Sequence, residues 1–225
     1  SVTATDKNGC ASSLSATVGQ PFVLSATVIS KINVSCYGGN NGSIDLGANG
    51  GTSPYTYIWN NSATTQDISG LSATAFAVTV TDSKNCTAYT STSLTQPDSL
   101  VVTVTSQTNV SCNGGNNGSI NITVSGGTNP YSYNWSNGST VEDPPGLSAN
   151  TYTVTVTATG GCTKTASATI IQPAGISVSL NIKTNVTCNG GNNGAIDINV
   201  TGGTSPYIYN WSNGAATEDI SNIAA

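Results

Sequence analysis

Cysteine is the residue of this sequence with the most distinctive chemistry, and its spacing is regular. Two series advance with one constant 76-residue step, namely Cys10, Cys86 and Cys162, and Cys36, Cys112 and Cys188. Regularly spaced, even-numbered cysteines in short β-rich modules are typical of disulfides in an oxidising compartment. The alternative is a metal site, but the chain contains neither histidine nor a CxxC pair, which are the usual ligand patterns. We therefore predict that the cysteines form disulfides.

Two pairing schemes fit this spacing. The first joins cysteines at a 26-residue separation, as Cys10–Cys36, Cys86–Cys112 and Cys162–Cys188, and the second joins cysteines at a 50-residue separation, as Cys36–Cys86 and Cys112–Cys162. Loop closure gives about 3.5 and about 4.1 kcal/mol for the two schemes, which does not separate them. A hairpin between Cys86–Thr95 and Leu100–Ser111 would bring the 26-residue pairs together, whereas a plain sandwich would hold the 50-residue pairs too far apart. The 26-residue scheme is the preferred prediction.

Acidic residues are the next candidates for chemistry. Asp67, Asp143 and Asp219 recur at the same step, and Glu142 and Glu218 precede two of them. Calcium takes six to eight oxygen ligands, mostly from carboxylates and carbonyls, so the three aspartates are calcium candidates. Neighbouring strand residues point to opposite faces, however, and an aspartate that bonds the backbone of its own turn is the simpler interpretation. No other cofactor is expected.

The chain offers little for catalysis. Because it has no histidine, a serine or cysteine nucleophile would need a lysine or a carboxylate to activate it. The lysines do not follow the repeat, since Lys84 has Gly160 as its counterpart and Lys164 has Ala88. We therefore expect that the protein is not an enzyme.

Charge and hydropathy exclude two further classes of protein. Only 7% of the residues are charged and the net charge is −5, without a basic cluster, so the nucleic-acid contacts that Lys and Arg make are not expected. No run of about 18 apolar residues occurs, so no membrane span is expected. Low charge on exposed sheet edges favours edge-to-edge pairing, which predicts lateral self-association.

The elements that position these residues are short strands. Trp59, Trp135 and Trp211 keep the 76-residue step and are the predicted core anchors. The segments 109–138 and 185–214 are identical at 23 of 30 positions. In the middle copy, alternation with a period of two indicates strands over 119–124, 131–135 and 152–157, and no segment has helical periodicity. GGNNG loops at 38–42, 114–118 and 190–194 could cradle a ligand, but glycines in turns with positive φ explain them more simply.

These patterns predict an all-β chain. Six or seven strands per copy, with a turn signal about every 8–12 residues, are typical of a small antiparallel sandwich of immunoglobulin-like type. We predict tandem modules at 1–74, which is the most diverged copy, 75–150 and 151–225, with alternative breaks near 97 and 173. A module of this size buries only about 60–65% of its unfolded surface, so it needs a large aromatic anchor and a covalent link.

The ordered motifs resemble a known repeat. V-[ST]-C-x-G-G-N-N-G-[SA]-I, then G-G-T-x-P-Y-x-Y-x-W, then T-V-T-V-T and a cysteine resemble the SprB repeat of very large cell-surface adhesins of gliding and other Bacteroidota. The last two motifs are also similar to PKD-type modules, which are immunoglobulin-like β-sandwiches. The resemblance implies type IX export, an extracellular location at the cell surface, and a structural or adhesive role in a filament linked to attachment or gliding motility. It implies no catalytic residues.

The resemblance also indicates partners. Because the chain begins and ends within the pattern, we expect further repeats of the same longer chain, and surface polysaccharide or another cell-surface ligand as a possible target. Two alternative functions are an array of carbohydrate-binding modules, with the repeated tyrosines stacking on sugars, and an accessory region of a secreted enzyme.

Overall fold

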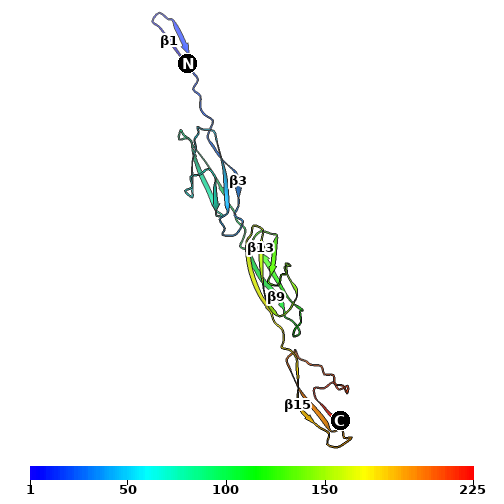
Figure 1. Ribbon diagram of the computed structural model, residues 1–225. Coiled ribbons are helices and arrows are strands. Elements are labelled where there is room, and N and C mark those ends of the chain that lie inside the picture. Colours follow the sequence, from blue (N-terminus) through cyan, green and yellow to red (C-terminus); the bar gives the residue numbers. More distant parts are fainter. The chain divides into compact units, whose positions relative to one another are not determined.

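Strands are the only regular elements of the computed structural model, which describes all residues from Ser1 to Ala225 (Figure 1). The strands are β1 (Val2–Thr5), β2 (Ala11–Leu14), β3 (Ser25–Ile32), β4 (Gly42–Asn49), β5 (Thr56–Trp59), β6 (Ile68–Leu71), β7 (Ala75–Thr81), β8 (Thr87–Ser93), β9 (Val101–Thr108), β10 (Gly118–Ser125), β11 (Tyr131–Trp135), β12 (Pro145–Leu147), β13 (Asn150–Ala158), β14 (Thr163–Ile170), β15 (Ser177–Thr184), β16 (Gly194–Thr201) and β17 (Ile220–Ile223). The structure contains no helix long and apolar enough to cross a membrane.

Two compact units divide the chain between Asp98 and Ser99. In the first unit, two three-stranded sheets have the orders β3-β4-β6 and β5-β7-β8, and all their pairs are antiparallel. Taken in chain order, these strands follow the A-B-E and C-F-G arrangement of an immunoglobulin sandwich, without strand D. The prediction of a small antiparallel sandwich of immunoglobulin-like type is therefore confirmed.

The second unit repeats this plan once and then begins it again. Strands β9 to β14 form the sheets β12-β10-β9 and β11-β13-β14, which correspond to those of the first unit. The third copy forms only the sheet β15-β16-β17. Residues 207–211, the counterparts of β11, form no strand, because the sequence to residue 225 contains no counterpart of β13 for them to pair with.

Alternating residues give each sandwich its core. In β13, Tyr152, Val154 and Val156 are buried, and the threonines between them are half-buried or exposed. On this outer side, Thr151 and Thr153 exchange hydroxyl hydrogen bonds with Thr169 and Ser167 of β14. The strand predicted over 152–157 thus forms, and it has an apolar inner and a hydroxyl outer face because a two-residue period places alternate side chains on opposite faces.

Each complete sandwich packs around one tryptophan. Trp59 and Trp135 are each 2% exposed and lie in two separate core clusters. Trp211 is only half-buried, since the residues up to 225 form only the first sheet of the third copy.

Each of the two core clusters extends across one of the predicted module boundaries. One cluster contains residues from Ile44 to Leu94 and the other residues from Val110 to Ile170. The predicted boundaries after residues 74 and 150 each cut through one of these clusters, so they do not separate packed modules. The alternative break near 97 lies at the division between the two compact units, and the alternative break near 173 follows the second cluster.

Candidate functional sites in the repeat

The cysteines do not pair as the sequence suggested. Cys10, Cys86, Cys112 and Cys188 are free and exposed, whereas Cys36 and Cys162 are disulfide-bonded. Every pair of the preferred scheme (Cys10–Cys36, Cys86–Cys112 and Cys162–Cys188) contains at least one free thiol, and so does every pair of the 50-residue scheme. Both sets of predicted pairs are therefore absent from the structure.

Strand pairing explains why the preferred scheme is wrong. The scheme needed the chain around β8 to fold back on β9, but β8 pairs with β7 and β9 pairs with β10. Cys86 lies in the β7–β8 turn, beside Gly51 and Phe22. Phe22 precedes the start of β3. Cys36 follows the other end of β3, where the Val34 N–H donates to the Thr95 carbonyl over 2.9 Å. The two cysteines of one sandwich thus lie at its opposite ends, as the argument against the 50-residue pairs expected.

An aspartate closes the turn that carries Cys86. Asp82 is 4% exposed, and its carboxylate accepts backbone N–H bonds from Lys84, Cys86 and Thr52 at 2.8, 2.9 and 2.8 Å. Burial by itself raises the pKa of Asp82, but the hydrogen bonds from Cys86, Thr52 and Lys84 outweigh it and lower the pKa below its ordinary value. Asp6 closes the equivalent turn before Cys10 in the same way, accepting the Asn8 and Cys10 N–H groups at 2.8 and 2.9 Å, whereas the middle copy has Ala158 at this place, so the carboxylate is a turn device that two of the three copies use.

The three calcium candidates serve as backbone acceptors. Oδ1 of Asp67, Asp143 and Asp219 accepts the N–H of the residue 21 positions earlier, namely Leu46, Ile122 and Ile198, at 2.9, 2.8 and 3.0 Å. Asp67 and Asp219 directly precede β6 and β17, and Asp143 lies two residues before the start of β12; each of these strands pairs only with the first part of β4, β16 or β10, respectively. The aspartate carboxylate therefore continues the hydrogen bonding where the strand pairing stops.

This partner could not be found from the sequence, where the aspartate seemed to bond its own turn. The structure contains no group of three or more His, Cys, Asp and Glu side chains that could hold a metal ion. The arrangement around these aspartates is that of a satisfied hydrogen bond between two strands.

The aromatic side chains bond to the repeat's own loops. The indole N–H of Trp59, Trp135 and Trp211 donates to the carbonyl six residues later, at 2.9 Å in each case. The hydroxyl of Tyr131 donates to the Gly126 carbonyl at 2.7 Å, and those of Tyr55 and Tyr207 donate in the same way to Gly50 and Gly202. The ring bodies thus face the core while their polar atoms hold the adjoining turn, which is the usual arrangement of buried Tyr and Trp.

The second tyrosine of each copy has an acidic or amide neighbour. Tyr57 donates its hydroxyl to Gln66 Oε1 at 3.1 Å. Burial, followed by the nearby Glu142 carboxylate, raises the pKa of Tyr133 above its ordinary value. Burial and Glu218 raise the pKa of Tyr209 in the same way. An ordinary tyrosine is already neutral near pH 7, so the raised pKa extends to higher pH the range in which these hydroxyls remain protonated.

A tyrosine corner supports the middle copy. Tyr152, near the start of β13, donates its hydroxyl to the Ser148 carbonyl at 3.0 Å, which is the contact that defines this corner in immunoglobulin-like sandwiches. The first copy has Phe76 at the same position and buries it without such a bond.

The GGNNG loops are closed by their own asparagines. Asn117 Oδ1 accepts the Ser111 N–H at 3.0 Å and its Nδ2 donates to Ser111 Oγ at 2.9 Å; Asn41 and Asn193 make the same pair of bonds. The Gly114 N–H donates to Gln172 Oε1 at 2.8 Å. Gly114 has a φ of 75°, as the turn interpretation predicts, because only glycine adopts this region at no cost. The loop's inward polar groups are thus used to close the end of the sandwich.

Known proteins match the chain in two ways. A family model described as SprB repeat matches residues 29–64, 104–140 and 180–216. Each match runs from within the first strand of a copy, through the GGNNG loop, to just past the tryptophan. No curated protein matches the sequence.

Several solved structures are similar in fold. They include the N-terminal eight immunoglobulin domains of the Down Syndrome Cell Adhesion Molecule (TM-score 0.45, 11% identity, 92% of this chain and 31% of that one). Others are Sidekick-1 immunoglobulin domains 1–5 (TM-score 0.31, 10%, 79% and 45%) and domains 4–9 of the surface layer protein SbsC (TM-score 0.31, 15%, 91% and 38%). The chain spans less than half the length of each of these structures.

The matches to the family model keep one phase relative to the strands, since all three begin within the first strand of a copy and end just past its tryptophan. The SprB repeat model thus matches one stretch in each of the three copies, of which two fold as complete immunoglobulin-like sandwiches and the third, to residue 225, as a single sheet.

Proposed function

We propose that the chain is a non-catalytic structural and adhesive segment of a secreted cell-surface protein. The observation that carries this proposal is that the polar side chains recurring at the same place in every copy are engaged within that copy. Asp143 bonds the Ile122 N–H, Asn117 closes its own loop, and Tyr131 holds the turn at Gly126. Because these recurring polar groups are bonded within the repeat itself, we infer that the repeat serves as a structural unit of a larger array.

The SprB matches support a location at the cell surface. The resemblance extends the proposal to an adhesin of Bacteroidota that is exported by the type IX pathway and acts in surface attachment or gliding. Its partners are then further repeats of a longer chain and a surface polysaccharide or another cell-surface ligand. Lateral self-association through exposed strand edges belongs to the same proposal.

The module phase is part of this proposal. We place the boundaries near 97 and 173, because the segments Gln96-Pro97 and Gln172-Pro173 close one end of the first and second sandwich. Gln96 Oε1 accepts the Gly38 N–H and Gln172 Oε1 accepts the Gly114 N–H, both at 2.8 Å. Each sandwich then begins shortly before its first strand.

Carbohydrate binding through the tyrosines is the alternative that the proposal must exclude. Tyr55, Tyr57, Tyr131 and Tyr133 are half-buried and pack against the two cores, so the part of each ring that contacts the core is not available to stack on a sugar. We expect no change in tyrosine or tryptophan fluorescence across a broad set of glycans. A saturable change with one glycan, lost on substitution of Tyr133 by Ala but retained on substitution of exposed Tyr89 by Ala, would favour the carbohydrate-binding function.

Intact cells of the source organism provide the test of location and role. Antibodies raised against the 225-residue chain should label unpermeabilised cells, and beads coated with the chain should adhere to a surface that the cells colonise, more than beads coated with albumin. Labelling that requires lysis of the cells, or adhesion equal to that of albumin beads, would contradict the surface or the adhesive part of the proposal, respectively.

A further inference from the structure

Asparagine followed by glycine is a reactive pair, and the two complete sandwiches contain five such pairs. They are Asn41-Gly42, Asn49-Gly50, Asn113-Gly114, Asn117-Gly118 and Asn137-Gly138. The glycine nitrogen of such a pair can attack the side-chain carbonyl carbon of the asparagine, because glycine has no side chain to hinder the approach. Hydrogen bonds that hold either group must break before they react. The bonds of each pair therefore decide how fast it is modified.

The GGNNG loops hold their Asn-Gly pairs in place. The carboxamide of Asn117 accepts the Ser111 N–H at 3.0 Å and donates to the Ser111 hydroxyl at 2.9 Å. Gly118 lies in β10, where it pairs with Leu147. Asn41-Gly42 has the equivalent contacts in the first repeat. Attack within these pairs requires the loop to open first.

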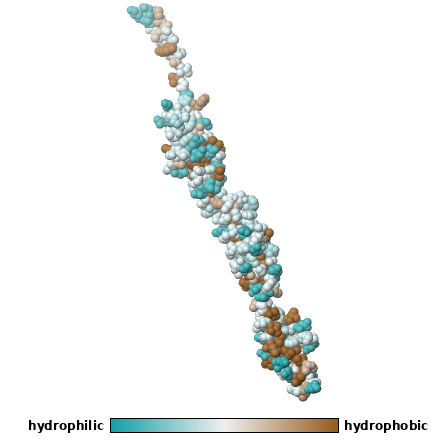
Figure 2. Space-filling model, in the orientation of Figure 1, coloured by the Kyte–Doolittle hydropathy of each residue, from teal (hydrophilic) through white to brown (hydrophobic).

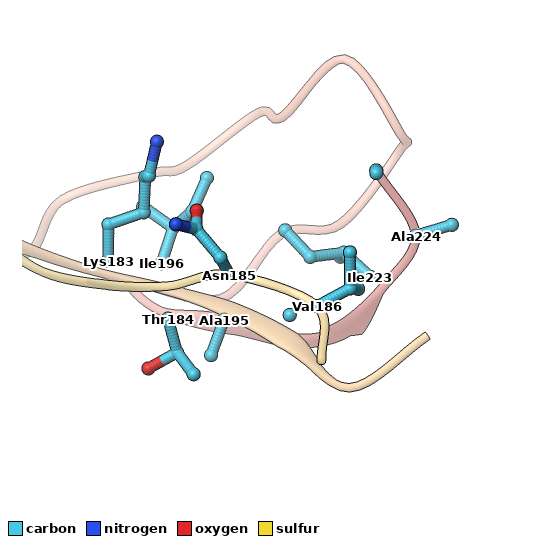
Figure 3. Close-up of a pocket in the computed structure, with 10 residues that line it drawn as sticks. Lys183, Thr184, Asn185, Val186, Ala195, Ile196, Ile223 and Ala224 are labelled. Carbon is cyan, nitrogen blue, oxygen red and sulfur yellow. The ribbon is translucent and has the colours of Figure 1, made fainter. Parts of the chain in front are cut away.

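The third repeat keeps this arrangement in its own GGNNG loop. Asn193 exchanges the same two bonds with Thr187, at 3.1 and 3.0 Å. Figure 3 shows Ala195, two residues further on, beside Thr184 of the neighbouring strand. The protection of the loop asparagine thus recurs in every repeat.

The other two pairs of the middle repeat have a bonded glycine N–H. In Asn113-Gly114, the glycine N–H donates to Gln172 Oε1 at 2.8 Å and the carboxamide donates to the Pro173 carbonyl at 3.2 Å. In Asn137-Gly138, the glycine N–H donates to the Trp135 carbonyl at 2.8 Å. The asparagine Oδ1 of that pair accepts the N–H of the residue after the glycine, at 3.1 Å. Both reacting groups are therefore engaged in each of these pairs.

Asn49-Gly50 differs from the other four pairs. Asn49 is the exposed last residue of β4, and neither its carboxamide nor the Gly50 N–H makes a hydrogen bond within the protein. Gly50 has a φ of 76°, and a Cβ added to it would clash with the Val23 carbonyl oxygen. The fold thus requires the glycine, whereas the asparagine before it is replaced by Ser125 in the middle repeat.

We propose that Asn49 is a site of spontaneous deamidation, with water as the reactant. Hydroxide removes the proton of the Gly50 nitrogen, which attacks Asn49 Cγ. The Cγ–Nδ2 bond breaks and ammonia leaves with a proton from water, so that a five-membered succinimide remains. Water then adds to either carbonyl of the succinimide and breaks that carbon's bond to the ring nitrogen. The products are aspartate and isoaspartate, and each carries a new carboxylate.

The modification acts on the turn that Gly50 begins. The Tyr55 hydroxyl donates to the Gly50 carbonyl, and the Gly51 N–H donates to the Phe22 carbonyl at 2.7 Å. Isoaspartate inserts one CH2 group into the backbone directly before these contacts and so displaces them, whereas aspartate leaves the backbone path unchanged.

The new carboxylate also changes a surface that carries few charges. Figure 2 shows side chains of intermediate hydropathy over most of the visible surface, and only 7% of the residues are charged. Deamidation makes the net charge of −5 more negative by one unit, so ion-exchange chromatography separates modified from unmodified chains.

Peptide mapping of the 225-residue chain by mass spectrometry tests the proposal. During incubation at mildly alkaline pH, Asn49 should be deamidated at least about 10-fold faster than Asn113, Asn117 or Asn137, because each hydrogen bond that must break first slows the reaction about five-fold. Asn49→Ser, which introduces the residue of the middle repeat, should remove this modification and leave the slower sites unchanged. An isoaspartate-specific methyltransferase should label the incubated wild type more strongly than the incubated Asn49→Ser variant.

The same incubation in urea is the control. Unfolding removes the hydrogen bonds that distinguish the pairs, so all five should then react at similar rates. Equal rates in the folded chain, or faster reaction at Asn113, Asn117 or Asn137 than at Asn49, would overturn the proposal. An Asn49 that stays intact in the folded chain but reacts in urea would overturn it as well, because the fold would then protect this pair too.

Discussion

Substitution of Ile120 by alanine tests how the middle sandwich is held together. Ile120 is 0% exposed and lies in the core cluster with Trp135 and Val154. The change removes three carbon atoms, and at about 0.8 kcal/mol for each buried CH2 the transfer term alone is about 2.4 kcal/mol. The cavity that remains raises the expected loss to about 2–5 kcal/mol.

Differential scanning calorimetry measures this loss. For a domain of this size, about 1 kcal/mol corresponds to about 4–8 °C in Tm, so the transition of the middle repeat should fall by about 10 °C or more. Hydrogen exchange assigns each transition to its repeat, because a chain of several modules does not unfold in one step. The first repeat, which forms a separate compact unit, should keep its Tm.

The same substitution elsewhere provides the control. Ile196→Ala changes the equivalent residue of the third repeat, which is only half-buried, and should cost less than half as much in the dilute chain. A Tm decrease below about 2 °C for Ile120→Ala, or equal losses for Ile120→Ala and Ile196→Ala, would refute the idea that the second sheet completes the core.

Three further predictions follow from single contacts. Tyr152→Phe removes the hydroxyl bond to Ser148 and should destabilise the middle repeat by about 1 kcal/mol in chemical denaturation. Phe76→Tyr adds a hydroxyl at the same position of the first repeat and should stabilise that repeat by a similar amount only if the new hydroxyl forms the equivalent bond of a tyrosine corner. The hydrogen bonds to Asp82 lower the pKa of its carboxyl below 3.8, so the stability that they contribute is fully present above pH 3.8 and is lost as the pH falls through the lower folded pKa. Asp82→Asn should therefore flatten the acid dependence of Tm in the first repeat. An unchanged acid dependence would refute this role. Asp143→Ala should lower the free energy of unfolding by about 1 kcal/mol because the Ile122 N–H loses its acceptor, and Asp143→Asn should lower it less. The Tm of neither variant should respond to calcium or a chelator. A calcium-dependent Tm that Asp143→Ala abolishes would instead support a metal site at Asp143.

Local patterns determined most of what the sequence could predict. The alternation of Tyr152, Val154 and Val156 indicated which face of the strand is buried, and the common step of Trp59 and Trp135 indicated one aromatic ring per core. These inferences succeed because side-chain direction in a strand depends only on the residue's position along it.

Contacts between strands that are distant in sequence could not be predicted from local patterns. Asp143 bonds the backbone N–H of Ile122, which belongs to a strand two elements earlier in the chain, and no local pattern names that partner. The cysteine pairing failed for a similar reason, since the path of the chain between β8 and β9 decides whether Cys86 can approach Cys112. The module phase depends on which hairpin covers which sheet, and a periodic sequence can be cut at any position.

Hydrogen exchange in a dilute, monomeric chain tests the central claim most directly. The segments around Ile120 and Ile196 are close copies in sequence, but only the first is covered by a second sheet. We predict that amides of β10 exchange at least about 100-fold more slowly than those of β16, because opening β10 requires unfolding of a complete sandwich. Equal protection of β10 and β16 would contradict the claim that a repeat becomes a stable sandwich only when its final hairpin covers its first sheet.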